Sequence, residues 1–183
     1  MTAHLILGGA RSGKSGHASR LAEASGLEVV LVATATRLEE DEELAERVAR
    51  HREARPASWL VVEEPVRLGE VLVAAHAVPG RLVVVDCLTV WLSNLLLADA
   101  EEALLRRERE HLFRILPGLP GPLVLVGNET GLGVVPMGRL TRRFVDENGR
   151  LHQDLARVCD RVTFMVAGLP MTLKGESPSC HPG

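Results

Sequence analysis

Aromatic side chains are scarce in this chain of 183 residues: they make up 3% of it, and tyrosine is absent. Proteins that hold single-stranded nucleic acids usually stack the bases on aromatic rings. The formal net charge of −3 provides no general attraction to a phosphate backbone either. Both features argue against nucleic acid as a substrate or partner.

Cysteine and long apolar runs are also in short supply. The three cysteines, Cys87, Cys159 and Cys180, show no Cys-x-x-Cys spacing, so they indicate neither a zinc site nor a disulfide framework. No apolar run approaches the roughly 20 residues that span a bilayer. Residues 4–7 already read as a strand, without the basic and long apolar regions of a secretory signal. We therefore expect a cytoplasmic protein with no membrane span.

Lysine is nearly absent, since only Lys14 and Lys174 are lysines among the 21 basic residues. Most surface positions accept arginine or lysine, but a compact ammonium beside phosphate oxygens is not interchangeable with a guanidinium. Lys14 is therefore a candidate phosphate-binding residue.

Short apolar runs alternate with longer helical patterns, which predicts an α/β fold with a mostly parallel sheet and helices on both faces. We expect one domain over residues 1–174 and a flexible tail over residues 175–183. Asn148-Gly149 marks a candidate break in the last expected helix. The expected strands are 4–8, 28–33, 59–63, 82–86, 123–127 and 161–166, and the expected helices are 14–25, 39–54, 67–77, 90–97, 100–116 and 139–158.

A glycine-rich segment between the first expected strand and helix fits the P-loop pattern Gly-x-x-x-x-Gly-Lys-Ser. Its glycines permit a tight turn that aims backbone N–H groups at phosphate oxygens, where the helix dipole also favours an anion. We expect Lys14 to span the β- and γ-phosphates and Ser15 to ligate Mg²⁺. The predicted triphosphate site consists of Gly8, Gly9, Ala10, Arg11, Ser12, Gly13, Lys14 and Ser15.

A second magnesium ligand is expected at the end of a neighbouring buried strand. Residues 82–86 read Leu-Val-Val-Val-Asp, the Walker B arrangement of apolar residues followed by an acid. An aspartate at a strand end is often structural, so its assignment depends on the P-loop. We expect Asp86 to hold Mg²⁺ together with Ser15.

His51 is surrounded by arginines, with Arg50 and Arg52 adjacent and Arg47 and Arg55 four positions away on one expected helical face. Positive neighbours disfavour imidazolium and so preserve a neutral nucleophilic nitrogen, while guanidinium groups can hold phosphates bidentately. The spacing alone nevertheless favours a solvated helix face on which His51 is a bystander. The other histidines show no metal-ligand spacing and are assigned no chemistry.

Several segments together resemble one family, in order from Leu5 to about Lys174. The family is that of the bifunctional adenosylcobinamide kinase/adenosylcobinamide-phosphate guanylyltransferases of cobalamin biosynthesis. The segments are the P-loop, Ala33-Thr34, Arg47-x-x-x-His51-Arg52-x-x-Arg55-Pro56-x-x-Trp59, Asp86-Cys87-Leu88-Thr89 and Asn128-Glu129-x-Gly131-x-Gly133-x-Val135-Pro136.

The resemblance implies two reactions. In the first, the aminopropanol hydroxyl of adenosylcobinamide is phosphorylated from ATP or GTP. In the second, the histidine matching His51 attacks the α-phosphate of GTP, and the resulting guanylyl-histidine passes GMP to the cobinamide phosphate, giving adenosylcobinamide-GDP. The resemblance therefore reverses the interpretation of His51, which is now expected to be the nucleophile. His51 and Lys14 are the two expected catalytic residues.

The same resemblance implies a RecA-like fold, a homotrimer and a set of nucleotide contacts. Some relatives carry a second histidine where this chain has Arg50, which leaves His51 as the candidate acceptor here. Besides the P-loop, the implied contacts are Thr34, Ala35, Thr36, Arg52, Glu53, Ala54 and Arg55, and less securely Glu63 and Asp86.

Two other functions are compatible with a P-loop by itself. A monofunctional small-molecule kinase would use the same cradle and leave His51 without a role. A RecA-like regulatory ATPase would hydrolyse nucleotide to drive a conformational change, which the acidic charge and few aromatics disfavour.

Overall fold

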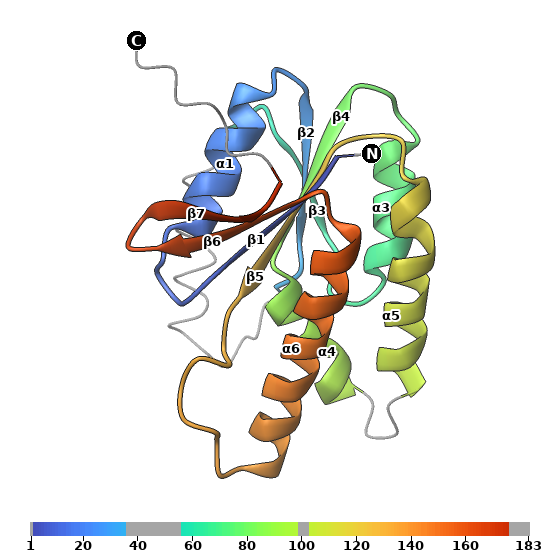
Figure 1. Cartoon of the computed structure of the whole chain (residues 1–183). Coiled ribbons are helices and arrows are strands. Elements are labelled where there is room, and N and C mark those ends of the chain that lie inside the picture. The colour runs from blue at the N-terminus through green and yellow to red at the C-terminus, as the bar shows by residue number, and fades with distance from the viewer. Residues whose placement is uncertain (1, 36–55, 99–102, 176–183) are drawn as a thin grey trace.

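The computed structural model describes residues 2–35, 56–98 and 103–175, and these form a seven-stranded sheet flanked by helices (Figure 1). The strands are β1 (Ala3–Gly8), β2 (Glu28–Ala33), β3 (Leu60–Glu63), β4 (Arg81–Asp86), β5 (Leu123–Asn128), β6 (Arg161–Val166) and β7 (Leu169–Lys174). The helices are α1 (Lys14–Ala24), α3 (Leu68–His76), α4 (Leu88–Ala98), α5 (Ala103–Ile115) and α6 (Arg139–Val158), with a short 3₁₀ helix, η1 (Leu116–Gly118).

The strand order is β3-β2-β4-β5-β1-β6-β7, and every neighbouring pair is parallel except β6 and β7. The mostly parallel sheet predicted from the sequence is thus confirmed. Because parallel strands end at the same edge of a sheet, β1 to β6 all direct their carboxyl ends to one side, where α/β proteins bind ligands.

Helices cover both faces of the sheet, as predicted (Figure 1). Leu5 and Leu7 of β1 face the larger core with α3, α4, α5 and α6, whereas Ile6 faces the smaller core with α1. α1 packs through the small residues Ala18 and Ala22, which are buried. Burial on both faces explains why the central strands read as nearly unbroken Val and Leu.

The predicted break at Asn148-Gly149 is wrong, since α6 continues through it. Asn148 is buried, and its amide donates to the carbonyl of Asn128 at 2.9 Å and to the hydroxyl of Thr130 at 3.1 Å. Glycine inside a helix costs about 1 kcal/mol relative to alanine. Burial of Leu151 and Leu155 offsets that cost. The Asn148 amide instead ties α6 to the end of β5.

Strand β7 has no counterpart among the predicted elements. Its apolar residues Leu169, Met171 and Leu173 alternate along the strand but are more than half exposed, so they form no buried apolar run. Pro170 is tolerated because β7 lies at the sheet edge. The alternation of apolar residues directly after Gly168 is the pattern in the sequence from which this strand could have been predicted.

Most other elements lie where the sequence predicts them, although α4 begins at Leu88 rather than at residue 90 and β4 already begins at Arg81. The predicted helix over residues 39–54 lies outside the described residues. Within the ranges that the structure describes, no helix is both long and apolar enough to cross a bilayer.

Candidate nucleotide site

The predicted P-loop connects the carboxyl end of β1 to the start of α1. Its backbone turns tightly, with positive φ angles of 55° at Arg11 and 94° at Gly13. The N–H of Ser12 donates to the carbonyl of Gly9 at 3.3 Å, and the Ser12 carbonyl accepts from the N–H of Gly168 at 3.0 Å. The turn between β6 and β7 therefore supports the loop from outside.

Gly13 is the N-cap of α1 and has no side chain with which to cap it. The first turn, Lys14-Ser15-Gly16, also contains no acidic residue. Backbone N–H groups at this helix end therefore remain for an anionic ligand, and the helix dipole favours negative charge there. Lys14 is 7% exposed and donates to the Gly9 carbonyl at 2.8 Å, so its ammonium is folded back over the loop.

Gly8 lies at the closest approach between the P-loop and β6. A Cβ at this position would lie 2.6 Å from the Ser12 Oγ and 2.7 Å from the backbone carbonyl oxygen of Met165. The carbonyl belongs to β6 and cannot move away cheaply. The first glycine of the motif is therefore required by packing as well as by the turn.

Replacing Gly8 by alanine should lower the free energy of unfolding by about 1–3 kcal/mol, the usual cost of forcing an extra group into packed structure. Thermal unfolding of the purified variant measures this. Gly9→Ala is the matched control, because a Cβ there meets nothing within 4 Å. Equal melting temperatures for Gly8→Ala and wild type would contradict the packing argument.

Thr34 connects the carboxyl ends of β2 and β4. Its side chain is completely buried; the hydroxyl donates to the Cys87 carbonyl at 2.7 Å and accepts from the Cys87 N–H at 3.0 Å. The Asn94 amide, from α4, donates to the Thr34 carbonyl at 2.8 Å and to the Pro65 carbonyl at 3.1 Å. The Asp86-Cys87 peptide bond is cis. This network fixes the chain on both sides of the predicted contacts Thr34, Ala35 and Asp86.

Asp86 ends β4, two strands from β1, because β5 lies between them. Strand spacing places these two strand ends roughly 10 Å apart. Burial raises the pKa of the adjacent Cys87 thiol to about 11, and Asp86 adds to this effect while Lys14 opposes it. The charges of Lys14 and Asp86 thus both act on the Cys87 thiol. With a pKa of about 11, this thiol stays protonated at neutral pH.

Ser15 and Asp86 provide a hydroxyl and a carboxylate, oxygen donors that suit Mg²⁺. Residues 2–35, 56–98 and 103–175 contain no cluster of three or more His, Cys, Asp or Glu side chains able to cage a metal. Mg²⁺ usually keeps several waters and is completed by substrate phosphates, so two protein ligands fit this ion better than an all-protein site would.

Glu63 ends β3, the outermost strand, and pairs in register with Ala33. Asp86 pairs with the opposite side of the same residue. The structure therefore brings the two acids to one edge, with β2 between them. Several other predicted site residues lie outside the described residues: Thr36, His51, Arg52, Glu53, Ala54 and Arg55.

A polar cluster lies at the end of β5. The sequence predicts no chemical role for it, although Asn128-Glu129 belongs to the motifs that carry the family resemblance. The N–H of Asn128 donates to the Thr89 hydroxyl at 2.6 Å, and the N–H of Glu129 donates to the Gly8 carbonyl at 2.9 Å. His152 of α6 lies 3.9 Å from Glu129, measured from Nδ1 to Oε2. Sequence spacing could not join these residues, because His152 is distant in the chain and shows no metal-ligand pattern.

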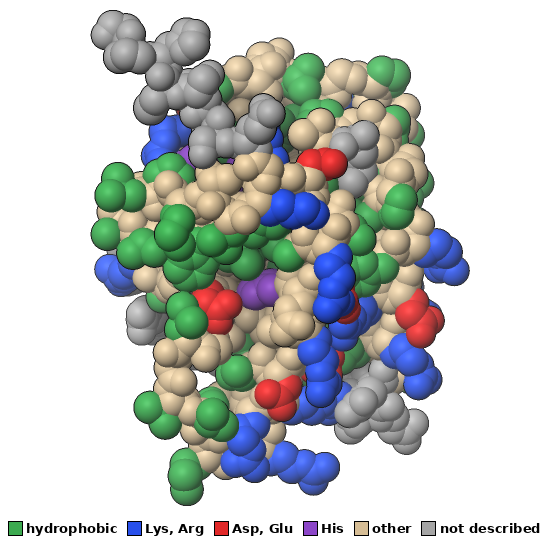
Figure 2. All heavy atoms as spheres, in the orientation of Figure 1, with side chains coloured by type: hydrophobic (Ala, Val, Ile, Leu, Met, Phe, Trp, Pro, Cys, Tyr) green, Lys and Arg blue, Asp and Glu red, His purple; other side chains and the backbone are tan. Residues whose placement is uncertain are grey.

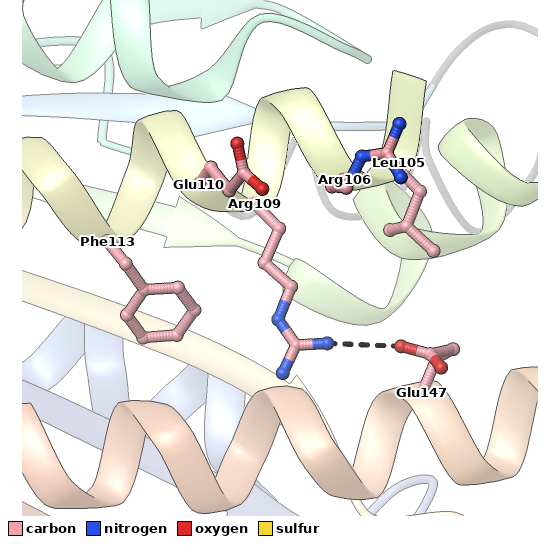
Figure 3. Close-up of a pocket in the computed structure, with 6 residues that line it drawn as sticks. All are labelled: Leu105, Arg106, Arg109, Glu110, Phe113 and Glu147. Carbon is pink, nitrogen blue, oxygen red and sulfur yellow. Dashed lines mark hydrogen bonds and ion pairs between the residues drawn. The ribbon is translucent and has the colours of Figure 1, made fainter. Parts of the chain in front are cut away.

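A cavity of about 370 Å³ lies between α5 and α6 (Figure 3). Arg109 projects into it toward α6 and pairs with Glu147 at 3.1 Å and with Asp154. Its charge is thus offset by two carboxylates, so the cavity does not provide a simple anion site. We assign it no part in the nucleotide chemistry.

Comparison with solved structures shows the fold. A KaiC-like protein of the archaeon Pyrococcus horikoshii matches 89% of this chain and 70% of its own, with a TM-score of 0.50 and 19% identity. The RadB recombinase matches 89% of this chain and 73% of its own, with a TM-score of 0.50 and 17% identity. The predicted P-loop, RecA-like fold is thereby confirmed.

Comparison with known sequences shows closer relatives. The chain is 58% identical over 172 residues to the bifunctional adenosylcobalamin biosynthesis protein CobP of Pseudomonas aeruginosa, covering 94% of this chain and 97% of that protein. It is 37% identical over 182 residues to the CobU proteins of Escherichia coli and Salmonella typhimurium, covering 93% of this chain and 98% of each. Residues 4–173 match the family described as cobinamide kinase/cobinamide phosphate guanyltransferase. The chain belongs to this family.

Proposed function

We propose that this protein phosphorylates adenosylcobinamide with ATP or GTP and then transfers GMP from GTP to the product, giving adenosylcobinamide-GDP. The family match over residues 4–173 names both activities, which favours this function over a monofunctional kinase or a regulatory ATPase. The transfer proceeds through a guanylyl-histidine at His51.

In the kinase reaction, the acceptor hydroxyl oxygen forms a bond to the γ-phosphorus while the bond to the β–γ bridging oxygen breaks. The P-loop N–H groups and Lys14 hold the phosphates and offset the charge that develops on them. Ser15 and Asp86 would hold Mg²⁺, which when bound supplies further charge neutralisation between the β- and γ-phosphates.

In the guanylyl transfer, a ring nitrogen of His51 forms a bond to the α-phosphorus of GTP, and pyrophosphate leaves. A phosphate oxygen of the cobinamide phosphate then attacks the same phosphorus, and the P–N bond breaks to restore His51. Contacts to the guanine nucleotide are proposed for the P-loop, for Glu63 and Asp86, and for Thr34, Ala35, Thr36, Arg52, Glu53, Ala54 and Arg55.

The observation that supports the proposal best is the start of α1. A glycine N-cap, an acid-free first turn and a buried Lys14 whose ammonium lies 2.8 Å from the Gly9 carbonyl give this helix start the positive character that suits a triphosphate. Both proposed reactions need a triphosphate in that position.

The covalent step is tested with GTP labelled at the α-phosphate. Wild-type protein incubated with this GTP and Mg²⁺ should carry label that is lost in acid and kept in base, as expected for a phosphoramidate. His51→Ala should carry none. An unlabelled wild type, or a variant labelled as strongly as wild type, would rule out His51 as the covalent acceptor.

We also propose a homotrimer that works in the cytoplasm. Exposed apolar side chains support association: they follow the β6-β7 ribbon and the loop between β5 and α6 (Figure 2). Large exposed apolar patches commonly mark protein interfaces. Those on the two segments are Val166, Leu169, Met171, Leu173, Leu132, Val134, Val135 and Met137.

A further inference from the structure

Glu129 follows the last residue of β5, at the edge where the phosphate loop begins. Asn128 pairs in register with Gly8, and the Glu129 N–H donates to the Gly8 carbonyl at 2.9 Å. Since β5 lies between β1 and β4, Glu129 leaves the sheet between the phosphate loop and Asp86.

Other carboxylates at this edge lie farther from the phosphate loop in strand order. Asp86 ends β4, which is two strands from β1, and Glu63 and Glu64 lie at the end of the outermost strand, β3. Asp86 is the expected magnesium ligand. Glu129 is therefore the acid nearest to the loop among these four and has no role so far.

The Glu129 side chain is held in place at one oxygen. Its Oε1 accepts a hydrogen bond from the N–H of Gly131, while Oε2 lies 3.9 Å from the Nδ1 of His152, beyond hydrogen-bond length. The side chain is 22% exposed, so solvent can reach it. The bond at Oε1 thus orients the carboxylate and leaves Oε2 able to accept a proton.

His152 lies beside this carboxylate, on the side toward the protein interior. Its side chain is only 6% exposed, and within the described part of the chain neither ring nitrogen makes a hydrogen bond. Gly127 makes room for the ring, because a Cβ there would lie 2.7 Å from Nε2. Burial lowers the pKa of His152 despite the opposing effect of Glu129, so the ring is neutral at neutral pH and does not cancel the carboxylate charge.

We propose that Glu129 receives the proton of the acceptor hydroxyl during the kinase reaction, an inference that rests on the function proposed above. As the hydroxyl oxygen bonds to the γ-phosphorus, its proton passes to the carboxylate. The bond between that phosphorus and the β–γ bridging oxygen breaks, and the nucleoside diphosphate leaves. The exposed part of the side chain then returns the proton to solvent.

The guanylyl transfer does not require this proton acceptor. Its attacking atoms are an imidazole nitrogen and a phosphate oxygen, neither of which carries a hydroxyl proton. Loss of the Glu129 carboxylate should therefore separate the two reactions, whereas loss of the loop geometry should impair both.

Glu129→Gln tests the carboxylate while keeping an amide oxygen for the Gly131 N–H. Its kinase kcat should fall by roughly 10²–10⁴-fold, the usual contribution of a positioned base, with little change in the KM for adenosylcobinamide. GMP transfer from GTP to separately prepared adenosylcobinamide phosphate should stay close to the wild-type rate.

Glu64→Gln is the matched control. Glu64 also follows a strand at this edge, and its Oε1 accepts the backbone N–H groups of Val66 and Arg67, each at 2.8 Å. Glutamine keeps the oxygen that binds these two N–H groups, and Glu64 itself has no proposed contact with either substrate, so both reactions should proceed at nearly the wild-type rate.

Glu129→Ala provides a second measurement through chemical rescue. Added formate should partly restore its kinase activity, because a small carboxylate can occupy the emptied position, and it should not accelerate wild type. A wild-type kinase rate in Glu129→Gln, an equal loss of both reactions, or no effect of formate on folded Glu129→Ala would each overturn the proposal. A wild type that phosphorylates no cobinamide would instead refute the proposed function itself.

Discussion

Lys14→Ala should lower both the kinase and the guanylyl transfer rates by roughly 10²–10³-fold, or about 3–4 kcal/mol of transition-state stabilisation. The reason is that both reactions need a triphosphate in the same cradle. Lys14 is 7% exposed and folded over the loop, so its ammonium acts where water screens little of its charge. Steady-state rates with GTP, measured separately for each reaction, check the prediction.

Lys174→Ala is the natural control, because Lys174 is the other lysine of the chain. Its ammonium also binds backbone carbonyls, those of Ala156, Arg157 and Cys159 at 2.7–3.0 Å around the end of α6. Its loss should reduce stability, since cations near a helix end stabilise its free carbonyls, yet leave both reactions intact. Retained kinase activity in Lys14→Ala would argue against one shared cradle.

His51→Ala should abolish guanylyl transfer, lowering its rate on the order of 10⁴-fold or more, as removal of a covalent nucleophile does. Phosphorylation of adenosylcobinamide should continue, because its attacking atom is the hydroxyl of the acceptor. Supplying the variant with adenosylcobinamide and GTP should therefore accumulate adenosylcobinamide phosphate, which chromatography of the products would show.

His111→Ala serves as the control for His51→Ala. The ring of His111 lies against Gly69, where an added Cβ would be 2.9 Å from Nδ1, so it packs α5 against α3. That variant should lose some stability and make the final product at nearly the wild-type rate. Normal GMP transfer by His51→Ala would refute the covalent route through His51. The kinase prediction would stand, because it does not depend on His51.

The phosphate loop was predictable from the sequence because its turn is specified by residues close together in the chain. The glycines at positions 8 and 13, followed by Lys14, specify a strand, a tight turn and a helix start within a few residues. The strands of the sheet centre were also predictable, since burial on both faces demands unbroken apolar runs.

Local patterns failed where tertiary contacts decided the outcome. The Asn148-Gly149 pair has the composition of a helix break, but the Asn148 amide binds β5 and Thr130, and α6 continues. β7 forms because it pairs with β6 at the sheet edge, although its apolar side chains remain largely exposed. His51 and its arginines lie outside the described residues, so their predicted arrangement stays a prediction.

The sequence by itself indicated a P-loop with its Lys14 and an aspartate, Asp86, at the end of a buried strand, and the order of its motifs indicated the family. Only the tertiary structure placed Glu129 beside that loop and His152 beside Glu129. The physical reason is strand order: β5 inserts between β1 and β4, and this pairing joins Glu129 to Gly8 across a long stretch of chain. No spacing in the sequence encodes which strands become neighbours.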